Sequence, residues 1–205
     1  MGDVLLYYRH MQSVIGIDEV GRGPVAGPVA VGAFHIFSND FFDEIKKFGV
    51  PLRDSKQLSK IQREAWYKKV HELQEEGKCD FSVCMVSAKE IDTHGISKAI
   101  KKALAESLEL LDIENNTLIL LDGSLHAPAQ YKNQITIIKG DEKEGVISLA
   151  SIVAKVTRDH YMIKLAEKYP MYGFEQHMGY GTEGHYTAIK KHGLSPHHRK
   201  SFLHL

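Results

Sequence analysis

Four acidic residues each follow a short apolar run, which is where a strand is expected to end. Asp18 and Glu19 follow the first such run, Asp122 follows a second and Asp141 follows a third. Ligand sites of open α/β sheets tend to lie at strand ends, and a charge beside a buried strand is costly unless it has a partner. We therefore expect the four side chains to converge. Each acid taken alone could simply cap a helix or make a turn, and Asp141 could cap the helix that follows it.

A converged set of carboxylates would favour metal binding. Two carboxylates about 4 Å apart repel each other by about 4 kcal/mol at an effective dielectric constant of about 20, and a divalent cation relieves that repulsion. Oxygen ligands select hard ions, so we expect Mg²⁺ or Mn²⁺, two ions per site, rather than zinc. Two such ions can activate a water and stabilise the leaving oxygen of a phosphodiester. The spacing predicts a carboxylate metal site and leaves the substrate open.

The elements that would position these acids follow from the spacing of the apolar residues. Continuous or alternating runs predict strands at residues 14–17, 25–37, 80–86, 117–121 and 134–138. Helical spacing predicts helices at residues 59–76, 96–111, 146–169 and 182–192. Ser59 and Thr182 would cap the first and last helix, and the first two strands would pair like a hairpin through the Gly-Arg-Gly-Pro turn. This order predicts an α/β fold with a mixed central sheet flanked by helices.

Composition and charge set wider limits. The 205 residues include 26 basic and 26 acidic ones, so the formal net charge is zero, and the hydrophobic content of 43% is ordinary for a globular domain. No stretch approaches the roughly 20 apolar residues of a membrane helix, and the N-terminus lacks a secretory pattern. Cys79 and Cys84 are expected to be reduced thiols in a strand rather than zinc ligands. These features favour a cytoplasmic protein with no membrane partner.

The last 30 residues are locally basic. Between residues 176 and 205 the sequence contains one acidic residue, Glu183, and four basic residues, Lys190, Lys191, Arg199 and Lys200. Six of the twelve histidines lie in the same segment. The distribution of charge matters more than its sum for binding nucleic acid. The segment is equally consistent with a nucleic-acid contact and with a solvated surface.

Six ordered blocks resemble the type 2 ribonucleases H, and specifically the ribonuclease HII family. They are Ile17–Pro24 (IDEVGRGP), Asp54–Leu58 (DSKQL), Leu121–Gly123 (LDG), Lys139–Asp141 with Ser148–Asp159, Gly179–Thr182 (GYGT) and His198–Phe202 (HRKSF). The resemblance spans nearly the whole chain, from about residue 15 to residue 202. A lone Gly-Arg-Gly would be weak, whereas six blocks in order are specific.

The resemblance implies a ribonuclease H-like catalytic domain over residues 1–170, with a C-terminal helical extension over residues 171–205 that packs on the active-site cleft. It implies endonucleolytic cleavage of RNA in RNA/DNA hybrids, and cleavage on the 5′ side of single ribonucleotides in duplex DNA, leaving 3′-hydroxyl and 5′-phosphate ends. It implies that the four acids are the catalytic metal ligands.

The resemblance also implies substrate-binding residues. Gly21, Arg22 and Gly23 would read the ribose 2′-hydroxyl through their backbone, because glycines allow close approach and the 2′-hydroxyl separates RNA from DNA. Tyr180 would stack on the sugar of the adjoining deoxynucleotide. The alternatives are that the glycines serve only a turn and that Tyr180 belongs to the core.

Four cationic side chains are candidates for phosphate contacts, namely Arg22, Lys56, Lys155 and Lys200. Surface solvation is the alternative for three of them. Lys155 lies in an apolar helix, so its ammonium must either emerge into a cleft or pair with an acid, and we favour the cleft. The sequence departs from the family pattern at Met178, where a lysine is usual, and at Ser124, where Asn is frequent.

Rival interpretations remain at this point. A DNA nuclease or resolvase on the same fold, a non-catalytic nucleic-acid-binding module and a type 3 ribonuclease H would share parts of the pattern. A binding module has no need of four acids facing a phosphate, and the type 3 enzymes usually carry an extra N-terminal domain. No clamp-binding peptide is evident, so we expect a monomer without a sliding-clamp partner.

Overall fold

The computed structural model describes residues 13–38, 41–114 and 116–203, and the first part of the chain supplies the sheet. Its elements are β1 (Val14–Val20), β2 (Val29–Ile36), α2 (Phe41–Ile45), η1 (Lys46–Phe48), α3 (Lys60–Glu75), β3 (Cys79–Val86), α4 (Ala88–His94), α5 (Ile96–Glu109), β4 (Leu118–Asp122) and β5 (Gln134–Ile137). The remaining elements are helical: α6 (Gly140–Lys143), α7 (Gly145–Lys168), η2 (Pro170–Tyr172), α8 (Phe174–His177), α9 (Glu183–His192) and η3 (Lys200–Phe202).

The five strands form one mixed sheet in the order β3-β2-β1-β4-β5. β1 pairs antiparallel with β2, and β2 pairs antiparallel with β3, so the first three strands make a meander. β4 runs parallel to β1, and β5 runs parallel to β4. This arrangement confirms the predicted mixed α/β sheet and the pairing of the first two strands.

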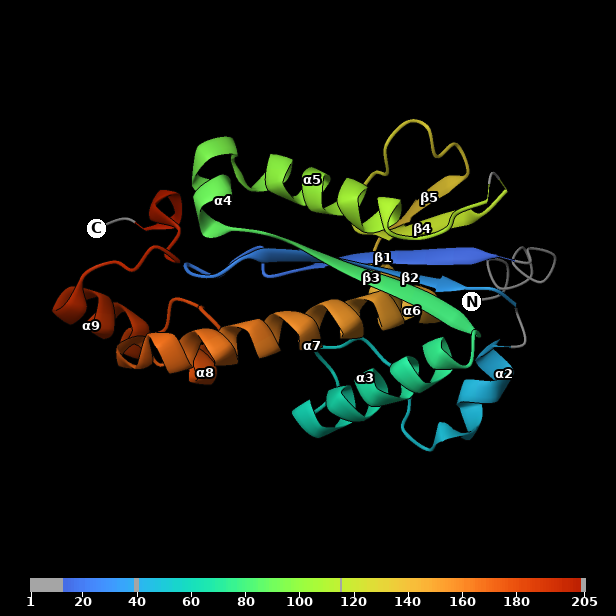
Figure 1. The fold of residues 1–205 in the computed structure, drawn as a ribbon, viewed down its shortest axis with the longest axis horizontal. Helices are drawn as coiled ribbons and strands as arrows, with labels where there is room; N and C mark the ends of the chain where they lie inside the picture. Colours follow the sequence, from blue (N-terminus) through green and yellow to red (C-terminus); the bar gives the residue numbers. More distant parts are fainter. Residues whose placement is uncertain (1–12, 39–40, 115, 204–205) are drawn as a thin grey trace.

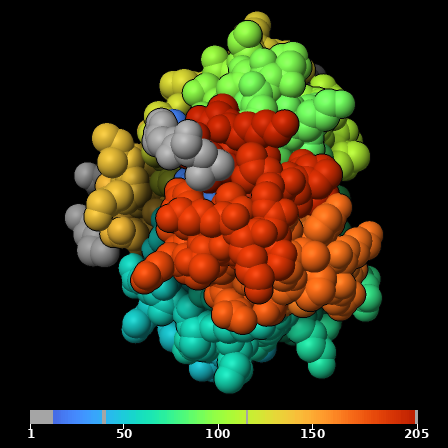
Figure 2. Space-filling view, turned by 90° about the vertical axis from the view of Figure 1, so that its left-hand side faces the viewer, coloured from blue at the N-terminus to red at the C-terminus, as the bar shows by residue number. Residues whose placement is uncertain are grey.

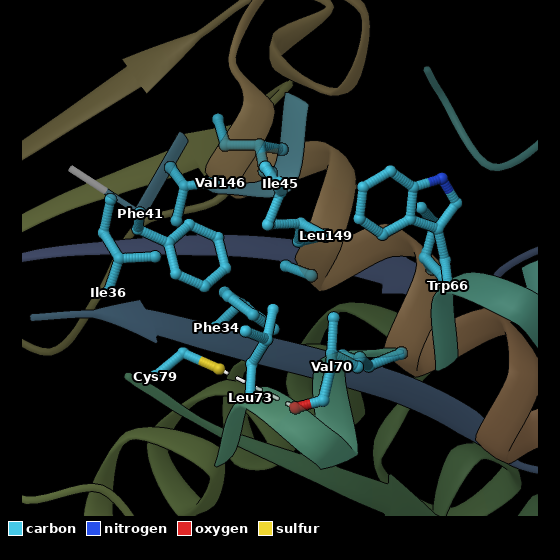
Figure 3. Close-up of a cluster of buried hydrophobic side chains, with 14 of the residues drawn as sticks. Phe34, Ile36, Phe41, Ile45, Trp66, Val70, Leu73, Cys79, Val146 and Leu149 are labelled. Atoms are coloured by element: carbon cyan, nitrogen blue, oxygen red, sulfur yellow. Dashed lines mark hydrogen bonds between the residues drawn. The ribbon is translucent and has the colours of Figure 1, made fainter. Parts of the chain in front are cut away.

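Helices cover both faces of the sheet. Figure 1 shows α4 and α5 on one face and α7 on the other, with α3 packed outside α7. The core between the sheet, α3 and α7 includes Phe34, Trp66 and Leu149, which are almost fully buried (Figure 3). Cys79 lies in the same core, and burial raises the pKa of its thiol to about 12. Both cysteines are free thiols in β3, as predicted.

The long helix α7 lies unusually close to β1 and β2, because two glycines face it. A Cβ on Gly16 would come within 2.4 Å of the backbone of Val146, and a Cβ on Gly32 within 2.5 Å of the carbonyl oxygen of Ala150. Side chains at these positions would push the helix away from the sheet. The close approach holds the N-terminal end of α7, and α6 before it, against the strands that carry the acids.

Local signals set most helix ends as predicted. Ser59 caps α3 by accepting a hydrogen bond from the backbone N–H of Gln62, and Thr182 caps α9 in the same way from His185. Gly193 ends α9. The second predicted strand, 25–37, is too long at its start, because β2 begins only at Val29 and the preceding residues pair with the C-terminal segment instead.

The C-terminal segment, residues 170–203, covers one end of the molecule. Figure 2 shows it between α4 and α5 above and α3 below. An isolated antiparallel bridge joins Ala26 to His198, so the turn that follows β1 is in direct contact with this segment. None of the helices in the described ranges combines the length and the apolar character that crossing a membrane requires.

Candidate active site

Two neighbouring parallel strands bring the first acids together. Ile17 of β1 is paired with Leu121 of β4, and Asp18 and Asp122 come one residue later in each strand. Because parallel neighbours end at the same edge of a sheet, both carboxylates lie at this edge. Glu19 follows directly in β1 and is largely buried, with its side chain 16% exposed.

Asp141 joins them through α6. The backbone N–H of Gly140 donates a hydrogen bond of 2.6 Å to Oδ1 of Asp122, so Asp122 and Asp141 are held in adjacent positions. Asp141 is buried, and its backbone carbonyl accepts a hydrogen bond from Ser148. The residue at the N-cap of α7 is Glu144, and it has no side-chain capping bond. The alternative in which Asp141 merely caps that helix is therefore wrong.

The four acids share one electrostatic neighbourhood centred on Asp18. Burial raises the pKa of Asp18 well above its ordinary value, and the charges of Asp122, Glu19 and Asp141 raise it further, against a hydrogen bond from Ser151 that lowers it. Burial also raises the pKa of Glu19, with an opposing effect of Arg22. A raised pKa means that a carboxylate binds a proton more readily. Clustered, buried carboxylates are expected to show such a raised affinity for positive charge.

Each carboxylate is engaged by a different donor. Asp18 accepts from the backbone N–H of Glu19 at 2.8 Å. Glu19 pairs with Arg22 at 3.4 Å, and Asp141 pairs with Lys56 at 3.3 Å. As they stand, no three Asp, Glu, His or Cys side chains in the described part of the chain are arranged to hold one metal ion.

The donor set nevertheless fits divalent metal. The four side chains offer only carboxylate oxygens, which suit Mg²⁺ or Mn²⁺. Two of them are paired with the cations of Arg22 and Lys56, whose side chains are 55% and 78% exposed and so are free to move aside.

The Gly21–Gly23 turn, which follows β1 directly, packs against a buried arginine of α7. Arg158 is fully buried and donates hydrogen bonds to three backbone carbonyl oxygens, those of Pro28, Met178 and Ala26, at 2.8 to 3.3 Å. Its side chain lies against Gly21, whose φ is +86°, so that a Cβ there would come within 2.2 Å of Nε. The backbone of the turn is shaped around this guanidinium group.

A second buried arginine holds the turn from the C-terminal segment. Arg199 is also fully buried, and its guanidinium group donates to the carbonyl oxygens of Gly27, Arg22 and Gly21 at 2.9, 3.0 and 2.7 Å. It also lies over the ring of Phe202, with its central carbon 5.1 Å from the ring centroid. Burial lowers the pKa of both arginines below the ordinary value, and the carbonyl oxygens take the place of water around the charge.

Sequence reasoning did not assign a role to these two arginines. The sequence does contain a signal for Arg158, because a cationic side chain within an apolar helix must find partners. Arg199 had no comparable signal, because its partners lie more than 170 residues away. The sequence places Arg199 among the basic residues of the C-terminal segment, whereas its charged group is buried inside the protein.

Tyr180 lies beside the same turn. A Cβ on Gly23 would meet only the Tyr180 ring, at 3.9 Å. The carbonyl oxygen of Gly179 accepts hydrogen bonds from the backbone N–H groups of Val25 and Ala26, which ties the two segments together. Tyr180 is 47% exposed, so the alternative in which it belongs to the core is wrong.

The predicted phosphate-contact residues differ in their surroundings. Arg22 and Lys56 are exposed and reach the acids, as described above. The sequence favours a cleft position for the ammonium group of Lys155. The structure instead pairs this group with Asp159 at 2.8 Å, and both side chains are mostly buried. Lys200 is exposed and lies at the start of η3, where its backbone N–H donates to Asp92.

Comparisons with known proteins agree on one family. The family model described as Ribonuclease HII matches residues 15–205. A Ribonuclease HII of Halalkalibacterium halodurans is 39% identical over 198 residues, which is 96% of this chain and 70% of that protein. The crystal structure of the ribonuclease H2 from Pyrococcus horikoshii OT3 has a TM-score of 0.74 at 31% identity, covering 92% of this chain and 93% of that one. The Archaeoglobus fulgidus structure, solved as a PCNA:RNase HII complex, has a TM-score of 0.71 at 26% identity, covering 91% and 93%.

Proposed function

The chain belongs to the ribonuclease HII family and is a type 2 ribonuclease H, an endoribonuclease for RNA/DNA hybrids; from that premise we propose that it also cuts single ribonucleotides out of duplex DNA. Cleavage would occur on the 5′ side of the ribonucleotide and leave 3′-hydroxyl and 5′-phosphate ends. One observation carries the proposal: the Gly21–Gly23 turn follows β1 directly, packs at Gly21 against the buried Arg158, and has two carbonyl oxygens bound by the buried Arg199.

The four acids would hold two divalent ions. Asp18, Glu19, Asp122 and Asp141 are the ligands we propose, with Asp18 shared because the other three charges surround it. Two Mg²⁺ or Mn²⁺ ions bound there would help to activate a water and to stabilise the leaving oxygen. Arg22 and Lys56 would exchange their acidic partners for phosphate oxygens of the substrate, since an ammonium or guanidinium group can bind either.

The fixed turn would read the ribose. Arg199 already occupies the carbonyl oxygens of Gly21 and Arg22, so the orientation of these peptide groups is set before substrate arrives. A preorganised backbone makes a correct hydrogen bond to a 2′-hydroxyl without first losing conformational entropy. The same turn begins two residues after Glu19, which would couple cleavage to the presence of the hydroxyl.

Tyr180 would read the neighbouring sugar. Its ring is exposed and lies next to Gly23, on the side of the turn that faces solvent. A tyrosine ring can pack flat against a deoxyribose, whereas an added hydroxyl would clash with it. The turn and the ring together would recognise a junction between RNA and DNA, which is the feature that a single embedded ribonucleotide presents.

The test is cleavage of a DNA duplex that contains one ribonucleotide, with Mg²⁺ and with Mn²⁺, mapping the cut site. Asp122→Asn should reduce cleavage by at least about a hundredfold, as loss of a metal ligand does, while leaving the fold intact. Asp112→Asn, at an exposed position outside the site, is the matched control. Wild-type cleavage by Asp122→Asn would overturn the assignment, and equal cleavage of an all-DNA duplex would favour a DNA nuclease.

The domain division, the cytoplasmic location and the monomeric state without a sliding clamp stay predictions. The N-terminal residues 1–12, on which the absence of a secretory pattern was judged, lie outside the described residues, as do residues 204–205 at the end. Light scattering of the purified protein, alone and mixed with a clamp, would measure the molar mass of any complex.

A further inference from the structure

Three histidine rings lie in series beneath the segment that carries Tyr180. His177 comes from α8, His185 from α9 and His198 from the segment before η3. The rings of His177 and His185 are stacked, with centroids 4.3 Å apart and planes 18° apart. Those of His185 and His198 have centroids 5.2 Å apart. His185 and His198 are 0% and 2% exposed, so this end of the molecule encloses a chain of polar rings.

The hydrogen bonds fix which ring nitrogen of His185 carries the proton. Nδ1 of His185 lies 2.8 Å from the carbonyl oxygen of Tyr180, which can only accept, so Nδ1 donates. In a neutral ring the other nitrogen, Nε2, must then be an acceptor. Nε2 lies 3.0 Å from Nε2 of His198, which therefore has to be the donor.

The surroundings of His198 supply the complementary arrangement. Its Nδ1 accepts a hydrogen bond of 2.9 Å from the backbone N–H of Ser195, and the Ser195 hydroxyl lies 2.8 Å away on the same nitrogen. His198 consequently carries its proton on Nε2, which is the atom that faces His185. The two rings have opposite tautomers and form one directed chain from Ser195 to Tyr180.

His177 holds the same backbone from the other side. Its Nε2 donates to the carbonyl oxygen of Tyr172, and its Nδ1 accepts from the backbone N–H of Gly179 at 3.2 Å. Gly179 has φ +85° and precedes Tyr180, so imidazoles hold the peptide N–H of Gly179 on one side and the carbonyl oxygen of Tyr180 on the other.

The groups that face the rings favour the neutral forms. Phe174 packs against both His185 and His198, and Tyr172 packs against His198. Their hydrogen-bond partners are backbone groups, Ser195 and each other, and none is a carboxylate within the described residues. The nearby cationic or titratable groups are His177, His197 and Arg199. Burial lowers the pKa of His198 to about 4, assisted by His185 and His197, and burial also lowers the pKa of His185.

We propose that His185 and His198 are positioning residues for Tyr180: as a neutral pair of opposite tautomers they hold its backbone, and so place its ring against the substrate sugar. A proton added to His185 would sit on Nε2 and set two N–H groups against each other across 3.0 Å. A proton added to His198 would sit on Nδ1 and face the backbone N–H of Ser195 at 2.9 Å, so either change would disturb the chain that ends at the Tyr180 carbonyl. The inference rests on the proposed role of Tyr180 in substrate binding.

Kinetics on the single-ribonucleotide duplex at neutral pH test the coupling. His198→Ala should raise KM by about fivefold to tenfold, the effect of losing one positioning hydrogen bond, and leave kcat nearly unchanged. Tyr180→Ala should raise KM as much or more, and adding His198→Ala to it should have no further effect. His198→Gln should restore KM, because its side-chain amide can donate to His185. His94→Ala, at an exposed position of α4, is the control.

The outcomes separate the two ideas. If Tyr180→Ala leaves KM unchanged, the proposed role of Tyr180 fails and the inference falls with it. If Tyr180→Ala raises KM but the effect of His198→Ala multiplies with it, the inference alone is overturned. Nitrogen-15 NMR of the wild-type protein gives a check without substrate. Protons on Nδ1 of His185 and on Nε2 of His198 support the directed chain of hydrogen bonds, and any other pair of tautomers rejects it.

Discussion

The guanidinium group of Arg199 donates a hydrogen bond of 2.7 Å to the carbonyl oxygen of Gly21, across 178 positions of the sequence. The turn next to two of the proposed metal ligands is thereby shaped by a residue close to the other end of the chain. Both partners are buried, so the bond is shielded from water and depends on the planar fork of an arginine.

Arg199→Lys should lower the free energy of unfolding by about 3 kcal/mol, because one ammonium group cannot reach the carbonyl oxygens of Gly27, Arg22 and Gly21 together. Urea denaturation measures the change. Arg53→Lys, at an exposed position, should be neutral. Equal stability of the two variants would show that the buried fork contributes nothing.

Gly21→Ala and Gly23→Ala form a matched pair in the turn. Gly21 has φ +86° and would place a Cβ 2.2 Å from Arg158, so this variant should lose at least about 1–2 kcal/mol of stability. A Cβ on Gly23 has space up to the Tyr180 ring at 3.9 Å, so the fold should tolerate it. Gly23→Ala should instead lower the preference for a ribonucleotide over a deoxynucleotide. Thermal melts and paired cleavage assays measure both effects; a normal preference in Gly23→Ala would argue against ribose reading at this residue.

Asp18→Asn should raise the melting temperature of the metal-free protein while abolishing cleavage. Burial and three neighbouring acids raise the pKa of Asp18, so its charge opposes folding when no cation is present. A neutral amide removes about 1 kcal/mol or more of that penalty and still accepts from the Glu19 backbone. Melts in chelator and in Mn²⁺ measure this, and the stabilisation by Mn²⁺ should shrink. A lower melting temperature in chelator would identify Asp18 as a structural acid.

The histidine pair predicts a loss of stability in acid. The folded-state pKa of His198 is about 4, below its ordinary 6.5, so the unfolded chain binds the proton more readily between these values. The contribution of His198 is complete above about pH 6.5 and falls as pH decreases to 4, by at most about 3 kcal/mol. Denaturation at several pH values should show a weaker acid loss in His198→Gln than in wild type. His94→Gln should follow the wild type; identical curves for all three proteins would exclude the effect.

Salt dependence distinguishes the two lysines. Lys155 pairs with Asp159, so Lys155→Met should lower stability by about 1–2 kcal/mol and leave the salt dependence of duplex binding unchanged. The Lys56 side chain is 78% exposed, and Lys56→Met should reduce the slope of log affinity against log salt by about one unit. Binding isotherms at several salt concentrations measure both. A reduced slope for Lys155→Met would restore the cleft position that the sequence favoured.

The parts of the fold that sequence predicted are those that local physics determines. Ser59, Thr182 and Gly193 mark helix ends through bonds within a few residues, and these ends were placed correctly. The placement of Asp18 and Asp122 at one edge of the sheet follows from a similar rule, because neighbouring parallel strands end at the same edge. The Lys155–Asp159 pair is also local, since the two residues are four apart on a helix. That spacing favours an ion pair over a position in the cleft.

The rest depended on contacts between distant segments. Residues 25–28 open the apolar run that was predicted as a strand, but their backbone groups bind Gly179, His197 and Arg199 instead of a neighbouring strand. The directed chain of His185 and His198 likewise requires three elements to meet. The spacing of apolar residues in a single sequence does not reveal such contacts between distant segments.

The bridge between Ala26 and His198 can form only late in synthesis, because the two residues are far apart in the sequence. A ribosome that adds about 5–20 residues per second completes β1 and its turn many seconds before it adds Arg199. The sheet edge with its acids can therefore form while the turn still lacks the bonds that give it its shape. A nascent or prematurely terminated chain would carry the proposed metal ligands without the fixed turn proposed to read the ribose, so selectivity for RNA would be the last property that the growing protein acquires.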